Sequence, residues 1–117
     1  MKKISVIVPM YFEEAVVSEC YNRLKEVLIN LKKYEYEIIF VDDGSRDQTL
    51  TILEKIALAN KNVKIISFSR NFGHQAAVGA GLRYSTGDAV IIIDADLQDP
   101  PELIPQMIEL WENGNDV

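Results

Sequence analysis

The chain has 117 residues, a formal net charge of −6, and 48% hydrophobic and 26% charged residues. This length is enough for one domain with one core, and no cluster of Lys and Arg offsets the negative charge to suit a nucleic-acid partner. The lone Cys20 excludes an intrachain disulfide and a cysteine-rich zinc site, and its place in an apolar stripe predicts burial. Because there is no signal peptide and no run of about 20 apolar residues, we expect this chain neither to cross a membrane nor to be secreted.

Short apolar runs alternate with helical periodicity along the chain. The apolar runs predict strands over residues 4–8, 36–41, 63–68 and 89–93. The helical spacing of apolar residues, and one segment rich in Ala and Gly, predict helices over residues 16–31, 48–60, 75–84 and 102–112. Pro9 is expected to end the first strand, and Asp116 looks like the opening of a further one. Such alternation predicts a parallel α/β sheet with right-handed crossovers.

The most informative stretch is AVIIIDADLQDPPE at residues 89–102. Its apolar run is typical of a strand buried on both faces, and the run ends in Asp94 and Asp96 with small Ala95 between them. Ligands of open α/β sheets bind beyond the carboxyl ends of the strands, and carboxylates together with the Gln98 amide oxygen suit Mg²⁺ or Mn²⁺. The alternative is that these acids only solvate the strand end and cap the next helix, as Asp99 is expected to do. We favour the metal site.

Acidic residues also follow the first two strands. Asp42 and Asp43 end the second strand. One acid is enough for capping and for the turn at Gly44. The second acid could therefore accept hydrogen bonds from a ligand or serve only the turn, and the sequence favours neither. Ser45 or Asp47 is expected to cap the following helix. For Glu13, the spacing alone favours a place in the first turn of a helix, where the helix dipole stabilises acids.

Arg70 precedes the segment rich in Ala and Gly and would add positive charge where the free amides of a helix start could receive an anion. The only histidine, His74, lies at this helix start and is assigned no role.

Four motifs together resemble those of the family-2 glycosyltransferases with the GT-A fold. They are VPMYFEE at residues 8–14, VDDGS at 41–45, SRNFGH at 69–74 and DADLQDPPE at 94–102. The chain is most similar to the polyprenyl-phosphate sugar transferases, meaning dolichol-phosphate mannose synthase-like enzymes and bacterial undecaprenyl-phosphate glucosyltransferases. The resemblance implies a GT-A, Rossmann-like parallel sheet with helices on both faces and strand order 3-2-1-4. It also implies that residues 1–117 are the nucleotide-sugar-binding part of a longer domain, truncated at its C-terminal side.

The resemblance further implies roles for individual residues. Those expected to bind the nucleotide sugar through its base and ribose are Pro9, Tyr11, Glu13, Val41 through its backbone, Asp42 and Asp43. Those expected at the diphosphate are Asp94, Ala95 and Asp96, with Asp94 and Asp96 catalytic and metal-binding and Gln98 a further metal ligand. Arg70 joins the residues expected to bind the nucleotide sugar because of its charge beside the helix start. Phe12 stands where the family commonly has Asn, so any contact made by that Asn is absent here.

The implied activity is that of a metal-dependent inverting glycosyltransferase using Mg²⁺ or Mn²⁺. It would move a sugar from a nucleotide-diphosphate sugar, UDP-glucose in preference to GDP-mannose, to a polyprenyl phosphate. The full-length bacterial protein would act on the cytoplasmic side of the cell membrane, in cell-envelope synthesis, attached through segments missing from this chain. We expect these 117 residues to bind the donor without transferring the sugar, and an unpaired sheet edge to favour a homodimer.

Three alternatives compete with this interpretation. A family-2 transferase acting on a sugar hydroxyl in polysaccharide synthesis would need a general base beyond Val117, and a non-catalytic nucleotide-binding module would need none. A signalling receiver domain fits less well, because the acidic pair follows the second strand and no fifth strand ending in Lys is present.

Overall fold

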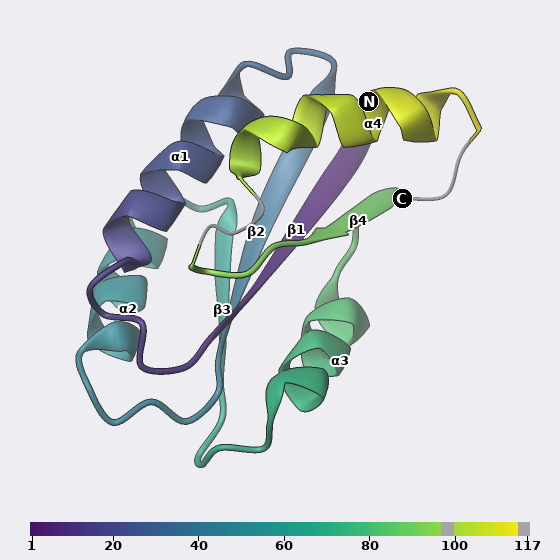
Figure 1. Cartoon of the computed structure of the whole chain (residues 1–117). Helices are drawn as coiled ribbons and strands as arrows, with labels where there is room; N and C mark the ends of the chain where they lie inside the picture. Colours follow the sequence, from purple (N-terminus) through teal and green to yellow (C-terminus); the bar gives the residue numbers. More distant parts are fainter. Residues whose placement is uncertain (97–99, 115–117) are drawn as a thin grey trace.

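The computed structural model describes residues 1–96 and 100–114. They form one four-stranded parallel sheet, with strands β1 (Lys2–Met10), β2 (Tyr34–Asp42), β3 (Val63–Ser67) and β4 (Ala89–Ile92). The strands lie in the order β3-β2-β1-β4, which confirms the order predicted from the resemblance (Figure 1). From β1 the chain adds β2 and then β3 on one side of the sheet, and it then returns to add β4 on the other side of β1. The loops after β1 and β4 therefore flank the point where the strand order reverses.

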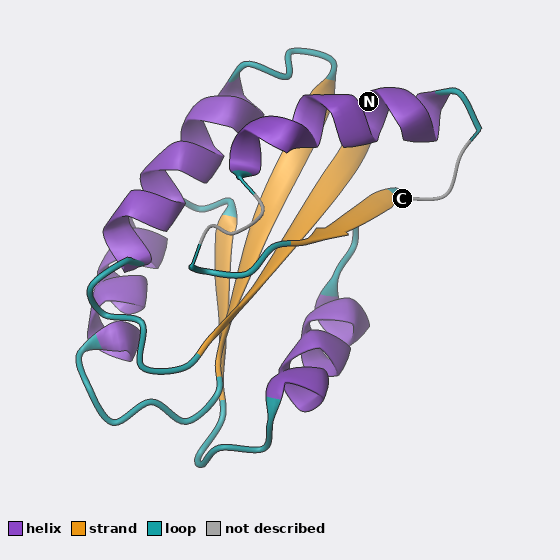
Figure 2. Cartoon of the chain, in the orientation of Figure 1, coloured by secondary structure: helices purple, strands orange, loops and turns teal. Residues whose placement is uncertain are grey.

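Helices cover both faces of this sheet. They are α1 (Val17–Ile29), α2 (Thr49–Ala59), α3 (His74–Tyr84) and α4 (Ile104–Glu112), the last preceded by a single 3-10 turn at Pro101–Leu103. Three of them, α1, α2 and α4, pack on one face, while α3 alone covers the other (Figure 2). Alternate residues of the central strand serve the two cores: Val6 and Val8 point to the larger one, and Ile7 points to Ala77 of α3.

Pro9 does not end the first strand, and this prediction was wrong. β1 continues to Met10, with Pro9 paired opposite Val41 of β2. The carbonyl of Ile7 accepts from Ile93 on the β4 side, so Pro9, two residues later, turns its nitrogen toward the same side. The pairing of β1 with β4 stops at Ile7, so the missing N–H of Pro9 removes no hydrogen bond between these strands.

The start of α1 also differs from the prediction. The helix begins at Val17, so Glu13 precedes its first turn instead of occupying it. Other local predictions are confirmed: Cys20 is fully buried, and Gly44 has a φ of 79°. The N-cap of α2 is Gln48, which makes no side-chain cap bond, so neither Ser45 nor Asp47 is the N-cap; Asp47, one residue earlier, still accepts from the Thr49 amide through Oδ1 at 3.0 Å. Asp116 lies outside the described residues.

A buried ionic cluster ties the amino-terminal ends of the strands together. Glu37 of β2 is 1% exposed, and its Oε2 accepts from Ser5 Oγ at 2.6 Å and from the Thr86 amide at 2.7 Å. Its other oxygen pairs with Lys64 of β3 at 2.5 Å and with Lys3 of β1 at 3.5 Å. Burial by itself would raise the pKa of Glu37, but the Lys64 ammonium and the bonds from Ser5 and Thr86 lower it to about 2. Glu37 therefore links three strands to the loop that leads into β4.

None of the helices within residues 1–96 and 100–114 has the length and apolar character needed to cross a membrane.

Candidate functional site

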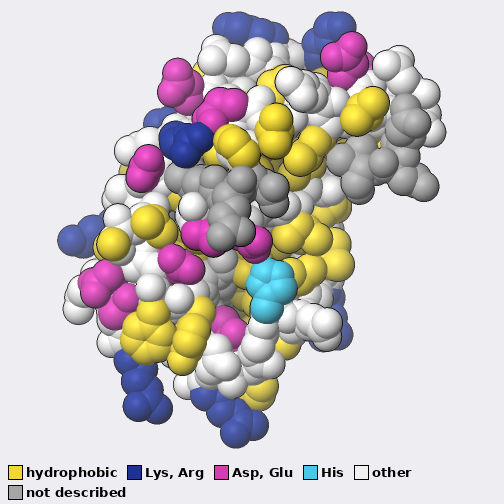
Figure 3. Space-filling view, viewed as in Figure 1, with side chains coloured by type: hydrophobic (Ala, Val, Ile, Leu, Met, Phe, Trp, Pro, Cys, Tyr) yellow, Lys and Arg dark blue, Asp and Glu magenta, His cyan; other side chains and the backbone are white. Residues whose placement is uncertain are grey.

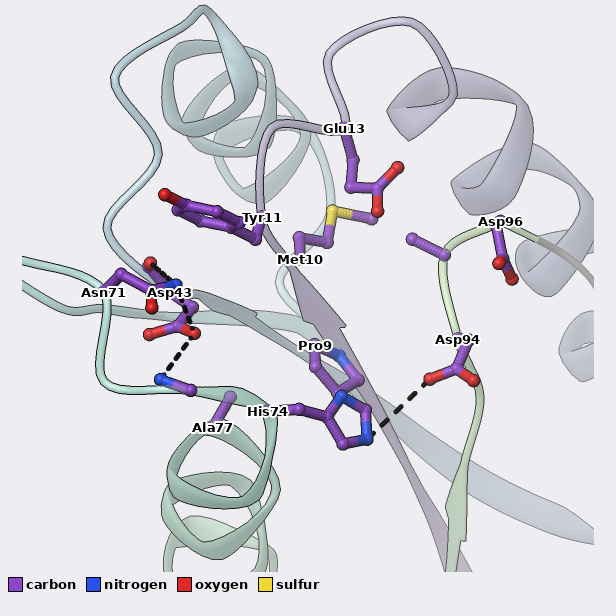
Figure 4. Close-up of a pocket in the computed structure, with 12 residues that line it drawn as sticks. Pro9, Met10, Tyr11, Glu13, Asp43, Asn71, His74, Ala77, Asp94 and Asp96 are labelled. Atoms are coloured by element: carbon purple, nitrogen blue, oxygen red, sulfur yellow. Dashed lines mark hydrogen bonds and ion pairs between the residues drawn. The ribbon is translucent and has the colours of Figure 1, made fainter.

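A cleft of about 500 Å³ opens at the carboxyl ends of β1, β2 and β4. It is lined by seven residues that the sequence assigned to ligand binding: Pro9, Tyr11, Glu13, Asp43, Asp94, Ala95 and Asp96. It is also lined by five residues that received no role: Met10, Asn71, Gly73, His74 and Ala77. Figure 4 shows these side chains converging from the ends of the strands and the start of α3, and Figure 3 shows the acids gathered around the histidine on this face.

The loop after β1 forms one wall of the cleft and is fixed by one hydroxyl group of the β2–α2 connection and one at the start of α2. The Phe12 amide donates to Ser45 Oγ at 2.8 Å, and the Glu13 amide donates to Thr49 Oγ1 at 3.0 Å. These bonds hold the Tyr11 ring and the Glu13 carboxylate at the cleft, where Glu13 faces the end of β4 (Figure 4).

Three carboxylates, those of Glu13, Asp94 and Asp96, line the cleft on the side of β4. Burial raises the pKa of Glu13, and the negative charges of Asp96, Asp47 and Asp94 raise it further. Hard oxygen donors that repel one another are the kind of set that a divalent cation stabilises. Among the described residues, no three acids, histidines or cysteines already stand in metal-binding geometry. Gln98, the further predicted ligand, lies outside the described residues.

Asp43 organises the opposite wall. Its side chain is buried, with Oδ1 accepting from the Phe72 amide at 2.8 Å and Oδ2 accepting from Asn71 Nδ2 at 2.9 Å and the Gly73 amide at 3.0 Å. A carboxylate offers about four lone pairs, so one acceptor position is left for a ligand after these three bonds. The same side chain therefore shapes the loop and borders the cleft.

Two other predicted residues from β2 do not line the cleft. Val41 is fully buried in the core against α3, and Asp42 points to the opposite face of the sheet, where Phe40 also packs. Burial raises the pKa of Asp42, against hydrogen bonds from Ser45 that lower it, and the charges of Asp47 and Asp43 raise it further. Of the acidic pair, the cleft thus receives only Asp43.

Arg70 also lies outside the cleft. Its guanidinium sits 4.7 Å from the centre of the Phe72 ring, in a neighbouring pocket of about 290 Å³ that Arg46 also lines. The cleft itself contains the imidazole of His74, whose Nε2 is 4.0 Å from Oδ1 of Asp94.

Phe12 has an unusual backbone, with a φ of 55°. This left-handed conformation suits Asn, the residue common in the resembling family, and is strained for a bulky side chain. The Phe12 ring packs edge-on against Tyr11 at 4.6 Å between centroids and lines the neighbouring pocket.

Gly44 fixes the approach of the two loops beside the cleft. A Cβ at this position would lie 2.3 Å from the backbone carbon of Arg70, and the φ of 79° adds strain for any side chain. We expect Gly44→Ala to lower the free energy of unfolding by more than about 2 kcal/mol, since the left-handed conformation alone costs about 1–2 kcal/mol. Gly79→Ala is the matched control, because its Cβ meets nothing within 4 Å and helix propensity favours Ala by about 1 kcal/mol. Denaturant melts in which both variants are equally stable would contradict the close approach.

Comparison with known proteins assigns most of the chain to the family whose motifs it resembles. The family model described as Glycosyl transferase family 2 matches residues 5–117. The uncharacterized glycosyltransferase YkcC of Bacillus subtilis is 55% identical over 113 residues, covering 97% of this chain and 35% of that protein. The bactoprenol glucosyl transferase of Shigella phage SfX is 48% identical over 115 residues, covering 98% of this chain and 37% of that protein. The chain thus spans about a third of the length of these relatives.

Solved structures of glycosyltransferases share the fold. The mannosyltransferase PcManGT of Pyrobaculum calidifontis, in complex with GDP-Man and Mn²⁺, matches 92% of this chain and 32% of its own, with a TM-score of 0.79 and 25% identity. The glucosyl-3-phosphoglycerate synthase of Mycobacterium tuberculosis, in complex with Mn²⁺, UDP and glucosyl-3-phosphoglycerate, matches 97% and 41%, with a TM-score of 0.74 and 27% identity. These likenesses confirm the predicted GT-A fold.

Proposed function

The chain belongs to glycosyl transferase family 2, and we propose that its cleft binds the nucleotide-diphosphate sugar of a metal-dependent glycosyltransferase. The observation that carries this proposal is the convergence of seven residues, taken from motifs up to about 90 positions apart, on one cleft at the reversal of strand order. Solved relatives of this fold hold GDP-Man or UDP together with Mn²⁺.

For a full-length protein as long as these relatives, we propose that the acceptor is a polyprenyl phosphate and that the donor is UDP-glucose. Support comes from the bactoprenol glucosyl transferase that is 48% identical over 98% of this chain. Transfer of a sugar to a membrane lipid would place the full-length protein at the cytoplasmic face of the cell membrane. Residues 1–117 would be its donor-binding part, since they correspond to about a third of such relatives.

The carboxylates of Asp94 and Asp96, with Gln98 beyond them, would hold Mg²⁺ or Mn²⁺ at the diphosphate. Bound there, the cation would supply positive charge to the departing diphosphate. Glu13 and Tyr11 would enclose the donor from the β1 side, and the loop that Asp43 shapes would enclose it from the other. This chain's contribution is positioning and charge complementarity. A lipid phosphate is already ionised at neutral pH, so it needs no general base to attack the anomeric carbon and invert its configuration.

Calorimetric titration tests this function. We expect the chain to bind UDP and UDP-glucose in the presence of Mn²⁺, more tightly than GDP and GDP-mannose, and to lose at least about tenfold in affinity when EDTA removes the cation, equivalent to about 1.4 kcal/mol. Tighter binding of the guanine nucleotides would overturn the donor preference. Affinity that EDTA leaves unchanged would overturn the metal assignment, and an absence of binding to all four would overturn the function.

Replacing Asp43 tests how the base is read. Asp43→Asn should weaken UDP binding by about 1.5–3 kcal/mol, the range for a hydrogen bond to a charged group. The substitution also weakens the loop at residues 71–73, so the unfolding midpoint must be measured beside the affinity. Asp42→Asn, on the other face of the sheet, is the control and should leave affinity within about twofold, a difference of about 0.4 kcal/mol. If Asp42→Asn impairs UDP binding as much as Asp43→Asn does, Asp43 has no direct role at the base.

A further inference from the structure

The only histidine of the chain stands in one wall of the cleft and faces an acid in the other. His74 is the first residue of α3, and its side chain is 62% exposed. Its Nε2 lies 4.0 Å from Oδ1 of Asp94, and Figure 4 shows the ring and the carboxylate pointing toward each other. The proposed function gives His74 no task, although the ring borders the space that the donor would fill.

The spacing of the two groups selects the kind of ligand that fits between them. A separation of 4.0 Å is longer than a hydrogen bond, so His74 and Asp94 do not satisfy each other directly. When Nε2 carries its hydrogen it donates, whereas the carboxylate only accepts. A hydroxyl group complements both, because it can accept from the imidazole and donate to the carboxylate. A phosphate oxygen only accepts, so it suits His74 but is repelled by Asp94 unless a cation lies between them.

The backbone beneath the imidazole is held in place. The Gly73 amide donates to Oδ2 of Asp43 at 3.0 Å, and the Gly73 carbonyl accepts from the amide of buried Ala77 at 3.1 Å. His74 is therefore carried on a fixed turn, so binding a ligand need not order the backbone that bears the imidazole.

The place of His74 along the cleft identifies the hydroxyl. Figure 4 shows His74 next to the loop that Asp43 shapes, at the end proposed for the base, and Asp96 beyond Asp94 at the end proposed for the diphosphate. In a nucleotide sugar the ribose joins these two parts. Resting on the proposed function, we propose that His74 is a specificity-determining residue. Its imidazole binds a ribose hydroxyl opposite Asp94, so that the cleft prefers ribonucleotides to deoxyribonucleotides.

The test compares the affinity of the chain for UDP and GDP with that for their 2′-deoxy and 3′-deoxy analogues, all with Mn²⁺. We expect the wild-type chain to bind the preferred ribonucleotide about 2–12-fold more tightly than at least one deoxy analogue, the range for one net hydrogen bond. His74→Ala should remove this preference by weakening the ribonucleotide while leaving that deoxy analogue within about twofold. His74→Gln keeps an N–H donor and should retain part of the preference.

Gln75→Ala is the matched control, since Gln75 is also exposed at the start of α3 but does not line the cleft. Gln75→Ala should leave every affinity unchanged. Neither His74→Ala nor Gln75→Ala should shift the unfolding midpoint. The inference is overturned if His74→Ala weakens the ribonucleotide and both deoxy analogues equally, or weakens none of them. If the wild-type chain binds no nucleoside diphosphate at all, the proposed function itself fails, which is a different result.

Discussion

Asp96→Asn is expected to remove the metal-dependent part of nucleotide binding. A diphosphate placed beside Glu13, Asp94 and Asp96 is repelled unless a cation intervenes, and Asp96 is the later of the two acids after β4 that line the cleft. Removing one partner of such a charged contact costs about 2–5 kcal/mol, so UDP affinity in Mn²⁺ should fall at least about 30-fold. Titration with and without EDTA measures the loss, and EDTA should then make little further difference.

The control for the change in charge is Glu54→Gln. Glu54 is exposed on α2 and does not line the cleft, so its replacement removes the same charge without touching the site. Its affinity should match that of the wild-type chain. Unchanged affinity in Asp96→Asn would show that the cation, if it binds, is held elsewhere.

Glu37→Ala is expected to be the most destabilising single substitution proposed for this chain, by about 3 kcal/mol. It removes a buried carboxylate and leaves the Ser5 hydroxyl and the Thr86 amide without their acceptor. Lys64 and Lys3 are partly exposed and can return to water, which keeps the loss at the low end of the range for a broken buried pair. Chemical denaturation at neutral pH measures the change.

The same residue predicts a dependence of stability on pH. The pKa of Glu37 is lowered from its ordinary value of 4.5 to about 2 in the folded chain, so the unfolded chain binds the proton more readily. The stabilisation is therefore complete above about pH 4.5 and is lost as the pH falls toward 2. Glu37→Gln should lack this loss, whereas the exposed neighbour Glu35→Gln should retain it. Identical acid profiles for all three proteins would contradict the role of the buried cluster.

The sequence predicted the strands and the acids of β4 well because both depend on local pattern. An apolar run that ends in Asp94 and Asp96 predicts a strand that delivers its acids to the carboxyl edge of the sheet, and both acids line the cleft. The expected burial of this strand on both faces was wrong: β4 is an edge strand in which Ile91 is buried but Ile92 is 43% exposed. The alternation of side chains along β2 decides between Asp42 and Asp43. Val41 faces α3, so Asp43, two residues later, faces the same side. Spacing alone could not say on which face the cleft would open.

The remaining features depend on contacts between distant segments. His74 meets Asp94 only because α3 crosses to the face opposite α1, and Glu37 finds Lys64 and Thr86 only through strand register and the loop before β4. Arg70 was expected at the anion site, but its stacking on Phe72 turns it into the neighbouring pocket. Self-association through a sheet edge stays a prediction.

The central claim is that a nucleoside diphosphate binds in the cleft formed at the ends of β1, β2 and β4. Amide chemical shifts recorded while UDP and diamagnetic Mg²⁺ are added to the labelled chain test it most directly. We predict that the largest shifts occur at the amides that border the cleft, those of Tyr11, Gly73, His74, Ala95 and Asp96. Shifts concentrated instead around the pocket that residues 30–34 form with α4, or no saturable shifts at all, would contradict the account.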